Sequence, residues 1–328
     1  MRNVIFLMLC FCFLVGFSQE RNFITVHRTI KLMGSKFDIT VVADNEEIGY
    51  INIEEAVSEI KRIEKLISSW DENSETSLIN ANAGIKAVAV SFELFQLIER
   101  AIQISELTNG AFDITQAGLG SVWTFDGAMN YKPTEAEIKS SLTKVGYQNI
   151  ELNAKELTVF LKIKGMKIGF GAIGKGYAAD KAKEHLVEKQ VRAGVINAAG
   201  DFTTWGTKVT GEKWLIGIAN PLSKGKIFSW LPVLESSVAT TESFDRFVMI
   251  DGKKYSHIMD PRTGIPAIGI NSVSVFSKSA ELCDALSTAV FVLGVGRGMA
   301  LINQLNGTEV IILDSNNIMH KTPGILFD

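Results

Sequence analysis

The sequence predicts an α+β fold with a largely antiparallel sheet. Segments with the two-residue alternation of strands, as at Phe37–Val41, are interleaved with segments that carry apolar residues at helical spacing, as at Asn52–Ile67. Many neighbouring strand segments are separated only by short turns, such as Ala198–Asp201. Short turns favour hairpins over a doubly wound parallel sheet, because parallel strands need long crossover connections.

The expected elements follow one another along the chain. Strand patterns cover the regions 23–42, 150–168, 194–218, 229–247, 272–276 and 308–313. Helical patterns cover the regions 52–67, 92–108, 134–142, 174–189 and 280–294. Asn109–Gly110 ends the second helix, and Thr134 begins the third. Residues 68–83 are polar and turn-rich, and residues 118–132 are irregular, so we expect neither helix nor strand there.

Residues 1–18 are typical of a secretory signal peptide. Arg2 supplies the positive start and Val4–Phe17 the apolar core, and small residues precede an expected cleavage between Ser18 and Gln19. The apolar run is short for a membrane span, although an uncleaved N-terminal anchor stays an alternative. We find no lipoprotein cleavage pattern before a cysteine. We therefore expect export to the periplasm.

The net charge limits the classes of partner that the protein could bind, and the cysteine content limits the chemistry of its thiols. Removal of residues 1–18, which contain Arg2 and no acidic residue, changes the net charge from −3 to −4. The absence of a basic tail or Lys/Arg block argues against nucleic acid and anionic membranes as partners. Cys10 and Cys12 leave with the signal peptide, so Cys283 remains alone and cannot form an internal disulfide. Its apolar neighbours favour a buried hydrophobic role over a nucleophilic one.

Asp284 and Thr288 lie one helical turn apart within the apolar helix pattern 280–294. Residues at this spacing share a helix face, so a carboxylate and a hydroxyl stand side by side. Both are hard oxygen ligands of the kind that Mg²⁺ or Ca²⁺ binds. The alternative is structural, with Asp284 as a capping or ion-paired residue and Thr288 bonded to a helix carbonyl.

The glycines at positions 169, 171 and 174 spell the dinucleotide-binding fingerprint. No acidic residue follows at the required spacing in a second strand, which argues against a Rossmann unit. Gly171–Lys175 nevertheless places small residues and a lysine at a helix start, where backbone amides attract phosphate. A tight turn with a solvent-exposed lysine is the equally simple alternative.

Three further residues are candidates for a nucleotide site. His257 lies among polar, turn-forming residues, where it could act as an acid or base or could be an ordinary loop histidine. Asp113 follows a helix end, where it could line a pocket or merely cap a turn. Trp70 lies in a polar loop, where it could stack on a flat ring or cover the edge of the core.

Four ordered segments together resemble the ApbE family, the FAD:protein FMN transferases. They are Ala111–Asp113, Gly174–Asp180, Ser256–Gly264 and Asp284–Thr288, and the likeness extends from Met33 to Gly294 through Ser68–Trp70 and Asn197–Asp201. The resemblance implies a T-fold-like α+β architecture and a single catalytic domain over residues 19–328. It also implies Mg²⁺-dependent transfer of FMN from FAD to a threonine of a partner protein, with AMP leaving.

The resemblance assigns roles by position. The metal ligands would be Asp284, Thr288 and the carbonyl of Ala172, and His257 would be the acid or base near the diphosphate. The FAD site would be lined by Met33, Trp70, Ala111, Phe112, Asp113, Lys175 and Ile258. The acceptor would be a threonine-bearing domain of a respiratory flavoprotein, which could bring the enzyme close to a membrane.

The chain departs from the family pattern at several positions. Gly169 stands where many members carry an aspartate that contacts FAD, and Ala199 stands where a second glycine is usual. Thr241 and Ser243 replace a more typical serine and glycine. These changes bear on nucleotide affinity and on the product. An Mg²⁺-dependent FAD pyrophosphatase and a non-catalytic flavin-binding protein therefore stay open as alternatives.

Overall fold

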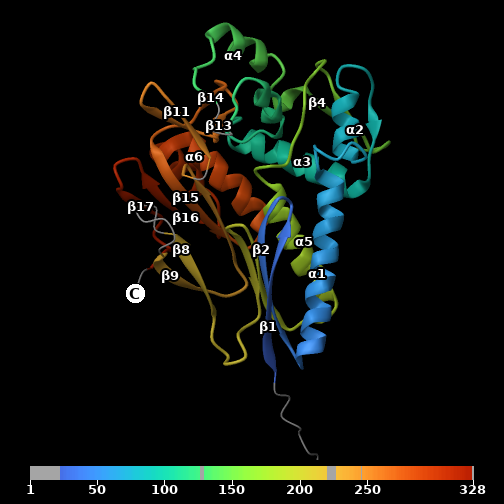
Figure 1. The fold of residues 1–328 in the computed structure, drawn as a ribbon, viewed down its shortest axis with the longest axis vertical. Helices are drawn as coiled ribbons and strands as arrows, with labels where there is room; N and C mark the ends of the chain where they lie inside the picture. Colours follow the sequence, from blue (N-terminus) through green and yellow to red (C-terminus); the bar gives the residue numbers. More distant parts are fainter. Residues whose placement is uncertain (1–22, 126–128, 220–226, 245, 327–328) are drawn as a thin grey trace, which may run out of the picture.

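The centre of the structure is a sheet of eight strands in which each neighbouring pair runs antiparallel (Figure 1). The computed structural model describes residues 23–125, 129–219, 227–244 and 246–326, so the expected signal peptide over residues 1–18 lies outside it. The expected α+β class with antiparallel sheet is confirmed. In spatial order the strands are β1 (Ile24–Leu32), β2 (Ser35–Ala43), β6 (Ala193–Ala198), β7 (Asp201–Trp205), β10 (Ser237–Glu242), β15 (Ile270–Ser277), β16 (Glu309–Asp314) and β17 (Met319–Lys321).

The two faces of this sheet are covered differently. Phe37, Ile39 and Val41 of β2 are fully buried in the core beneath the helices, whereas the next residue, Val42, belongs to a second cluster on the other face. This alternation is the two-residue period of a strand. The second cluster contains residues of the β8 (Trp214–Ala219) and β9 (Ile227–Val233) hairpin.

Smaller sheets and six α-helices complete the described parts of the chain. The strands are β3 (Val88–Ala89), β4 (Ile150–Asn153), β5 (Thr158–Leu161), β11 (Phe247–Ile250), β12 (Lys253–Ser256), β13 (Met259–Asp260) and β14 (Ile265–Pro266). The helices are α1 (Glu46–Ile67), α2 (Glu75–Ala81), α3 (Phe92–Leu107), α4 (Glu135–Leu142), α5 (Gly174–Glu188) and α6 (Ala280–Ile302), with the 3₁₀ helices η1 (Ile114–Ser121) and η2 (Tyr147–Asn149). In Figure 1, α1, α5 and α6 run along the central sheet.

Local capping explains where several helices begin. Thr134 and Glu137 form a reciprocal capping box at the start of α4, as the sequence pattern predicts. The α1 helix begins six residues before the expected Asn52, because the side chain of Asn45 accepts a hydrogen bond from the Ile48 amide and caps it there. The helix α2 was not expected, since its seven residues are too few to show a clear period.

The helix α6 is long and apolar because it is a core helix. Of the helices in the described ranges, it is the one whose length and hydropathy would suit a membrane span, yet its first half is buried against β10, β15 and α5. The expected end at Gly294 is a break, where the backbone turns to φ 78° and ψ 174° before the helix continues to Ile302. The expected strand 308–313 is present as β16, but β17 follows it.

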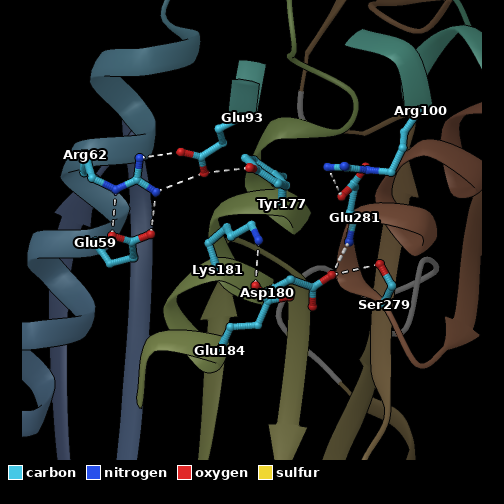
Figure 2. A network of polar contacts seen from close by, with 10 residues as sticks. All are labelled: Glu59, Arg62, Glu93, Arg100, Tyr177, Asp180, Lys181, Glu184, Ser279 and Glu281. Carbon is cyan, nitrogen blue, oxygen red and sulfur yellow. Dashed lines mark hydrogen bonds and ion pairs between the residues drawn. The ribbon is translucent and has the colours of Figure 1, made fainter. Parts of the chain in front are cut away.

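A network of polar side chains ties three helices together (Figure 2). Arg62 of α1 donates hydrogen bonds to both oxygens of Glu93 in α3, at 2.6 and 2.9 Å. Glu93 also accepts a hydrogen bond of 2.7 Å from the hydroxyl of Tyr177 in α5. The bond from Arg62 lowers the pKa of Glu93 below its ordinary value.

We predict that Glu93→Gln destabilises the protein at neutral pH by about 1–2 kcal/mol, because a charge-assisted pair is lost and partial exposure limits the loss. A carboxylate whose pKa is lower in the folded state stabilises it above the unfolded pKa, and this contribution is lost as the pH falls. Urea unfolding at pH 7 and pH 3 measures the difference, which should shrink at pH 3. The exposed Glu99→Gln in the same helix is the matched control. An equal difference at both pH values would contradict the ionic account.

Candidate active site

The first turns of α5 and α6 meet at a buried charge cluster. The Lys175 ammonium forms an ion pair with Asp201 and lies 3.6 Å from Oδ2 of Asp284. The same Asp284 oxygen accepts a hydrogen bond of 3.2 Å from the backbone amide of Gly176. The Asp201 and Asp284 side chains are 3% and 6% exposed, so both carboxylates are removed from bulk water. A buried carboxylate is tolerated only beside such partners.

Gly176 permits this close contact between the two helices. A Cβ at this position would stand 2.1 Å from the carbonyl oxygen of Ala280 and 2.9 Å from Cβ of Asp284. Both distances are shorter than any van der Waals contact, so glycine is the residue that lets α5 approach the start of α6. The approach also brings the Gly176 amide within hydrogen-bond distance of Asp284.

A second contact fixes the two helices relative to each other (Figure 2). Asp180 of α5 accepts hydrogen bonds from the Ser279 hydroxyl at 2.8 Å and from the Glu281 amide at 3.0 Å. Glu281 in turn is held by Arg100 of α3 at 2.7 and 3.0 Å. Carboxylates near a helix N-terminus are stabilising, so Asp180 holds the first turn of α6 in place. The position of Asp284 follows from this arrangement.

Asp201 is a site residue that the sequence did not single out by chemistry. The predicted turn Ala198–Asp201 is present, and Ala199 and Gly200 both have positive φ, at 56° and 106°. Positive φ at both central residues suits a tight hairpin turn. The turn places Asp201 as the first residue of β7, facing Lys175. Only the long-range contact between β7 and α5 reveals the pair.

The charges of this cluster perturb one another. Burial, and then repulsion from Asp284, raise the pKa of Asp201 above its ordinary value, although Lys175 opposes the change. Burial alone lowers the pKa of Lys175, but attraction from the two carboxylates outweighs it and raises that pKa above its ordinary value. The Lys175 side chain is 28% exposed and paired with Asp201, so the alternative of a lysine that extends freely into solvent is wrong for this structure.

Thr288 lies beside Asp284 on the same helix face, as its spacing predicts. Thr288 is 6% exposed, and its hydroxyl lies 3.3 Å from the hydroxyl of Thr241 in β10. The same Thr241 hydroxyl lies 2.7 Å from the hydroxyl of Ser287. Ala172 lies in the turn before α5 and is partly buried. These residues offer one carboxylate and neutral oxygens. Among the residues that the structure describes, no group of three or more His, Cys, Asp or Glu side chains could hold a metal.

This donor set fits Mg²⁺ better than a transition metal. Mg²⁺ is commonly bound by one or two carboxylates together with water and substrate phosphates. A soft or imidazole-rich metal centre would need thiolates or histidines, which the cluster lacks in its described residues. The structural alternative for Asp284 is also realised, since it bonds the α5 amide and lies close to Lys175.

The expected flavin-contacting residues differ in accessibility. Trp70 is 93% exposed in the loop between α1 and α2, so its ring is open to a flat ligand. Ala111 and Phe112 are 1% exposed, and their amides donate to the carbonyl and hydroxyl of Thr108. The side chains of Ala111 and Phe112 are therefore buried and their amides are bonded within the fold, and their contact with FAD stays a prediction.

Asp113 has a structural role in this arrangement. Its Oδ1 accepts from the amide and hydroxyl of Thr115 at 2.8 and 2.7 Å, and its Oδ2 accepts from the Tyr147 amide at 2.8 Å. It thereby caps η1, the capping alternative that the sequence left open. Burial raises its pKa, although these bonds oppose the change. Its contact with FAD stays a prediction.

Met33 and Ile258 pack against two different hydrophobic clusters of the fold. Met33 follows β1 with a positive φ of 49°, and a Cβ on Gly174 would stand 3.9 Å from its Cε atom. Ile258 is buried with the apolar residues of α6 around Cys283 and Leu286.

The single free thiol of the described residues, on Cys283, is also buried. Burial raises the pKa of Cys283 to about 12, so this thiol is a buried hydrophobe, as expected.

His257 lies in the loop between β12 and β13. Its amide and its Nδ1 lie 3.0 and 3.1 Å from the carbonyl oxygen of Arg246, a contact that orients the ring. The preceding hydroxyl, on Ser256, is 4% exposed and has no hydrogen-bond partner among the described residues. A buried hydroxyl without a partner calls for a ligand atom or water. The sequence marked this segment but not this hydroxyl.

Comparison with known proteins decides the family. The ApbE family pattern matches residues 33–312. The chain belongs to the ApbE family. It is 32% identical over 259 residues to the FAD:protein FMN transferase of Klebsiella pneumoniae, covering 78% of this chain and 80% of that one. It is 29% identical to the FAD:protein FMN transferase of Treponema pallidum, covering 84% and 80%.

Solved structures of ApbE proteins have the same fold. The ApbE protein of Thermotoga maritima superimposes with a TM-score of 0.84 at 30% identity, over 91% of this chain and 97% of that one. The flavinyl transferase ApbE of Pseudomonas stutzeri gives a TM-score of 0.80 at 24% identity, over 92% and 94%. The chain therefore spans nearly the whole length of both ApbE structures.

We predict that Gly176→Ala separates the first turns of α5 and α6 and destabilises the protein by about 2–4 kcal/mol, because an overpacked buried contact forces backbone shifts. Thermal unfolding measures the loss. Gly296→Ala is the control, because a Cβ there meets no atom within 4 Å. Equal melting temperatures for Gly176→Ala and the parent would show that the helices do not depend on this contact.

We also predict that Ala199→Gly stabilises the protein by about 0.5–1 kcal/mol, because a residue with a Cβ at positive φ is strained. Urea unfolding of the two proteins side by side gives the difference. A loss of stability would mean that the added freedom of the unfolded chain outweighs the strain.

Proposed function

We propose that this ApbE-family flavin transferase moves FMN from FAD to a threonine hydroxyl of a partner protein, requires Mg²⁺ and releases AMP. The observation that carries the proposal is the buried cluster of Asp284, Lys175 and Asp201 at the start of two helices. A site that splits a diphosphate needs charge neutralisation and alignment more than covalent help. Family membership supports the flavin transfer, and the cluster supports the divalent ion.

The residues of this chain have distinct tasks in the proposed reaction. Asp284, Thr288 and the Ala172 carbonyl would hold Mg²⁺, which supplies Lewis acidity at the phosphate oxygens. Lys175 would offset the negative charge that grows on the leaving phosphate. Trp70 and Met33 would contact the flavin part of FAD.

His257 would act as acid or base at the diphosphate. The threonine oxygen forms a bond to the FMN phosphorus, and the bond from that phosphorus to the oxygen of AMP breaks. The hydroxyl proton passes to a nearby base, for which His257 is the candidate, and AMP leaves with the bridging oxygen. The orientation of His257 by the Arg246 carbonyl supports this assignment.

The acceptor and the compartment are also part of the proposal. A signal peptide over residues 1–18 would place the enzyme in the periplasm. There, a threonine-bearing domain of a respiratory flavoprotein would be the acceptor, and its membrane anchor would bring the enzyme close to the membrane.

The decisive experiment follows AMP and covalent flavin together. The chain from Gln19 is mixed with FAD and Mg²⁺, with and without a threonine-bearing acceptor domain, and AMP release and gel fluorescence are recorded. Acceptor-dependent AMP with a fluorescent acceptor band supports the transferase. AMP and free FMN without acceptor would indicate the pyrophosphatase, and bound FAD with neither product would indicate a flavin-binding protein.

We predict that Asp284→Ala lowers the rate of FMN transfer by at least about 100-fold, because the proposed metal loses its charged ligand. Asp44→Ala, in the exposed connection between β2 and α1, is the matched control and should keep the parent rate. Initial rates of AMP release at saturating Mg²⁺ measure the effect. Parent-like transfer by Asp284→Ala would refute the metal assignment.

A further inference from the structure

The ammonium of Lys175 lies beside the carboxylate that would bind Mg²⁺. It is 3.6 Å from Oδ2 of Asp284, within ion-pair distance, and it makes its closer ion pair with Asp201. An ammonium and a divalent cation compete for the same buried carboxylate, because each neutralises its charge. Where Lys175 is held therefore affects how readily a metal binds at Asp284.

Asp201 is rigidly placed, whereas the lysine side chain is long and flexible. Asp201 begins β7 directly after the tight turn at Ala199–Gly200, and that turn is fixed by a bond of 2.8 Å from the Gly200 amide to the side-chain oxygen of Asn197. The whole Asp201 residue, backbone included, is only 2% exposed. Lys175 has rotatable bonds up to its ammonium, so the ammonium follows the fixed carboxylate.

We infer that Asp201 is a positioning residue, which draws the Lys175 ammonium towards β7 and so leaves the Asp284 carboxylate available to a divalent cation. The inference rests on the proposed metal site at Asp284. Without the charge of Asp201, Lys175 would pair with Asp284 alone and would exclude the metal. Asp201 acts through Lys175 in this account and does not contact the metal.

A direct role for Asp201 as a metal ligand makes a different prediction. If Asp201 only controls Lys175, its loss matters only while Lys175 is present. If Asp201 binds the metal itself, its loss weakens binding whether or not Lys175 is present. A double-mutant cycle of Asp201→Asn and Lys175→Met separates the two cases.

The experiment titrates the full chain with Mn²⁺ alone, in place of Mg²⁺, and measures free Mn²⁺ by electron paramagnetic resonance. We expect Asp201→Asn to weaken Mn²⁺ binding by about 10-fold or more, the range found for residues that act behind a metal ligand. Lys175→Met should tighten binding, and the double variant should bind Mn²⁺ within about threefold of Lys175→Met, because the loss of Asp201 matters only while Lys175 is present.

Two results would overturn the inference. One is unchanged Mn²⁺ affinity in Asp201→Asn, and the other is a double variant that binds Mn²⁺ about 10-fold more weakly than Lys175→Met, because Asp201 would then act without the lysine. The surface pair Lys208 and Glu212, at 3.7 Å, supplies the matched control, because the Glu212 side chain is 69% exposed, and Glu212→Gln should leave Mn²⁺ affinity unchanged. An equal loss in Glu212→Gln would show that overall charge is responsible, which also overturns the inference.

Failure of the metal site itself gives a separate result. Parent protein that binds no Mn²⁺, or Asp284→Ala that binds it as well as the parent, would refute the proposed metal site and this inference with it. Circular dichroism melts of each apo variant report folding. If Asp201→Asn does not fold, the Mn²⁺ affinity of Lys175→Met alone tests the inference. A Lys175→Met variant that binds Mn²⁺ no more tightly than the parent would show that the lysine does not compete with the metal, and would overturn the inference.

Discussion

The close contact between the first turns of α5 and α6 is the constraint on which the rest of the site depends. Gly176 lets the α5 backbone approach Ala280, and the carboxylate of Asp284 completes the contact by accepting the Gly176 amide. Asp180 holds the same two helices together one turn further along α5. The position of Asp284 beside the start of α5 follows from this packing, because side chains in close-packed interiors have little freedom to move, whereas the turn before β7 places Asp201.

Burial of the charge cluster costs free energy, because its charged groups lose their contact with water. Asp201 and Asp284 lose their hydration, and Lys175 compensates for both with one positive charge. Buried ion pairs contribute little net stability, so such an arrangement points to function more than to folding. A local excess of negative charge around one ammonium is also what a divalent cation would neutralise. The same electrostatics therefore supports both the proposed metal site and the proposed control of Lys175 by Asp201.

The proposed flavin site is assembled from segments that are far apart in the sequence. The loop after β1, the loop after α1, the start of α5 and the loop before β13 each contribute a residue. Exposure separates their roles, since Trp70 is open to a ligand while Ala111, Phe112 and Asp113 are buried and bonded within the fold. Asp113 caps η1 and accepts a hydrogen bond from the Tyr147 amide, so its observed role is structural.

The sequence by itself determined the α+β class, most helices and strands, and the shared helix face of Asp284 and Thr288. These depend on short-range periodicity and on caps such as Thr134, which act between residues a few positions apart. The order of its motifs also indicated the ApbE family. The tertiary structure alone decided that Asp201 faces Lys175, that Asp113 accepts a hydrogen bond from the Tyr147 amide, and that α6 continues past Gly294. Such features depend on contacts between distant segments, which packing brings together and which no local pattern records.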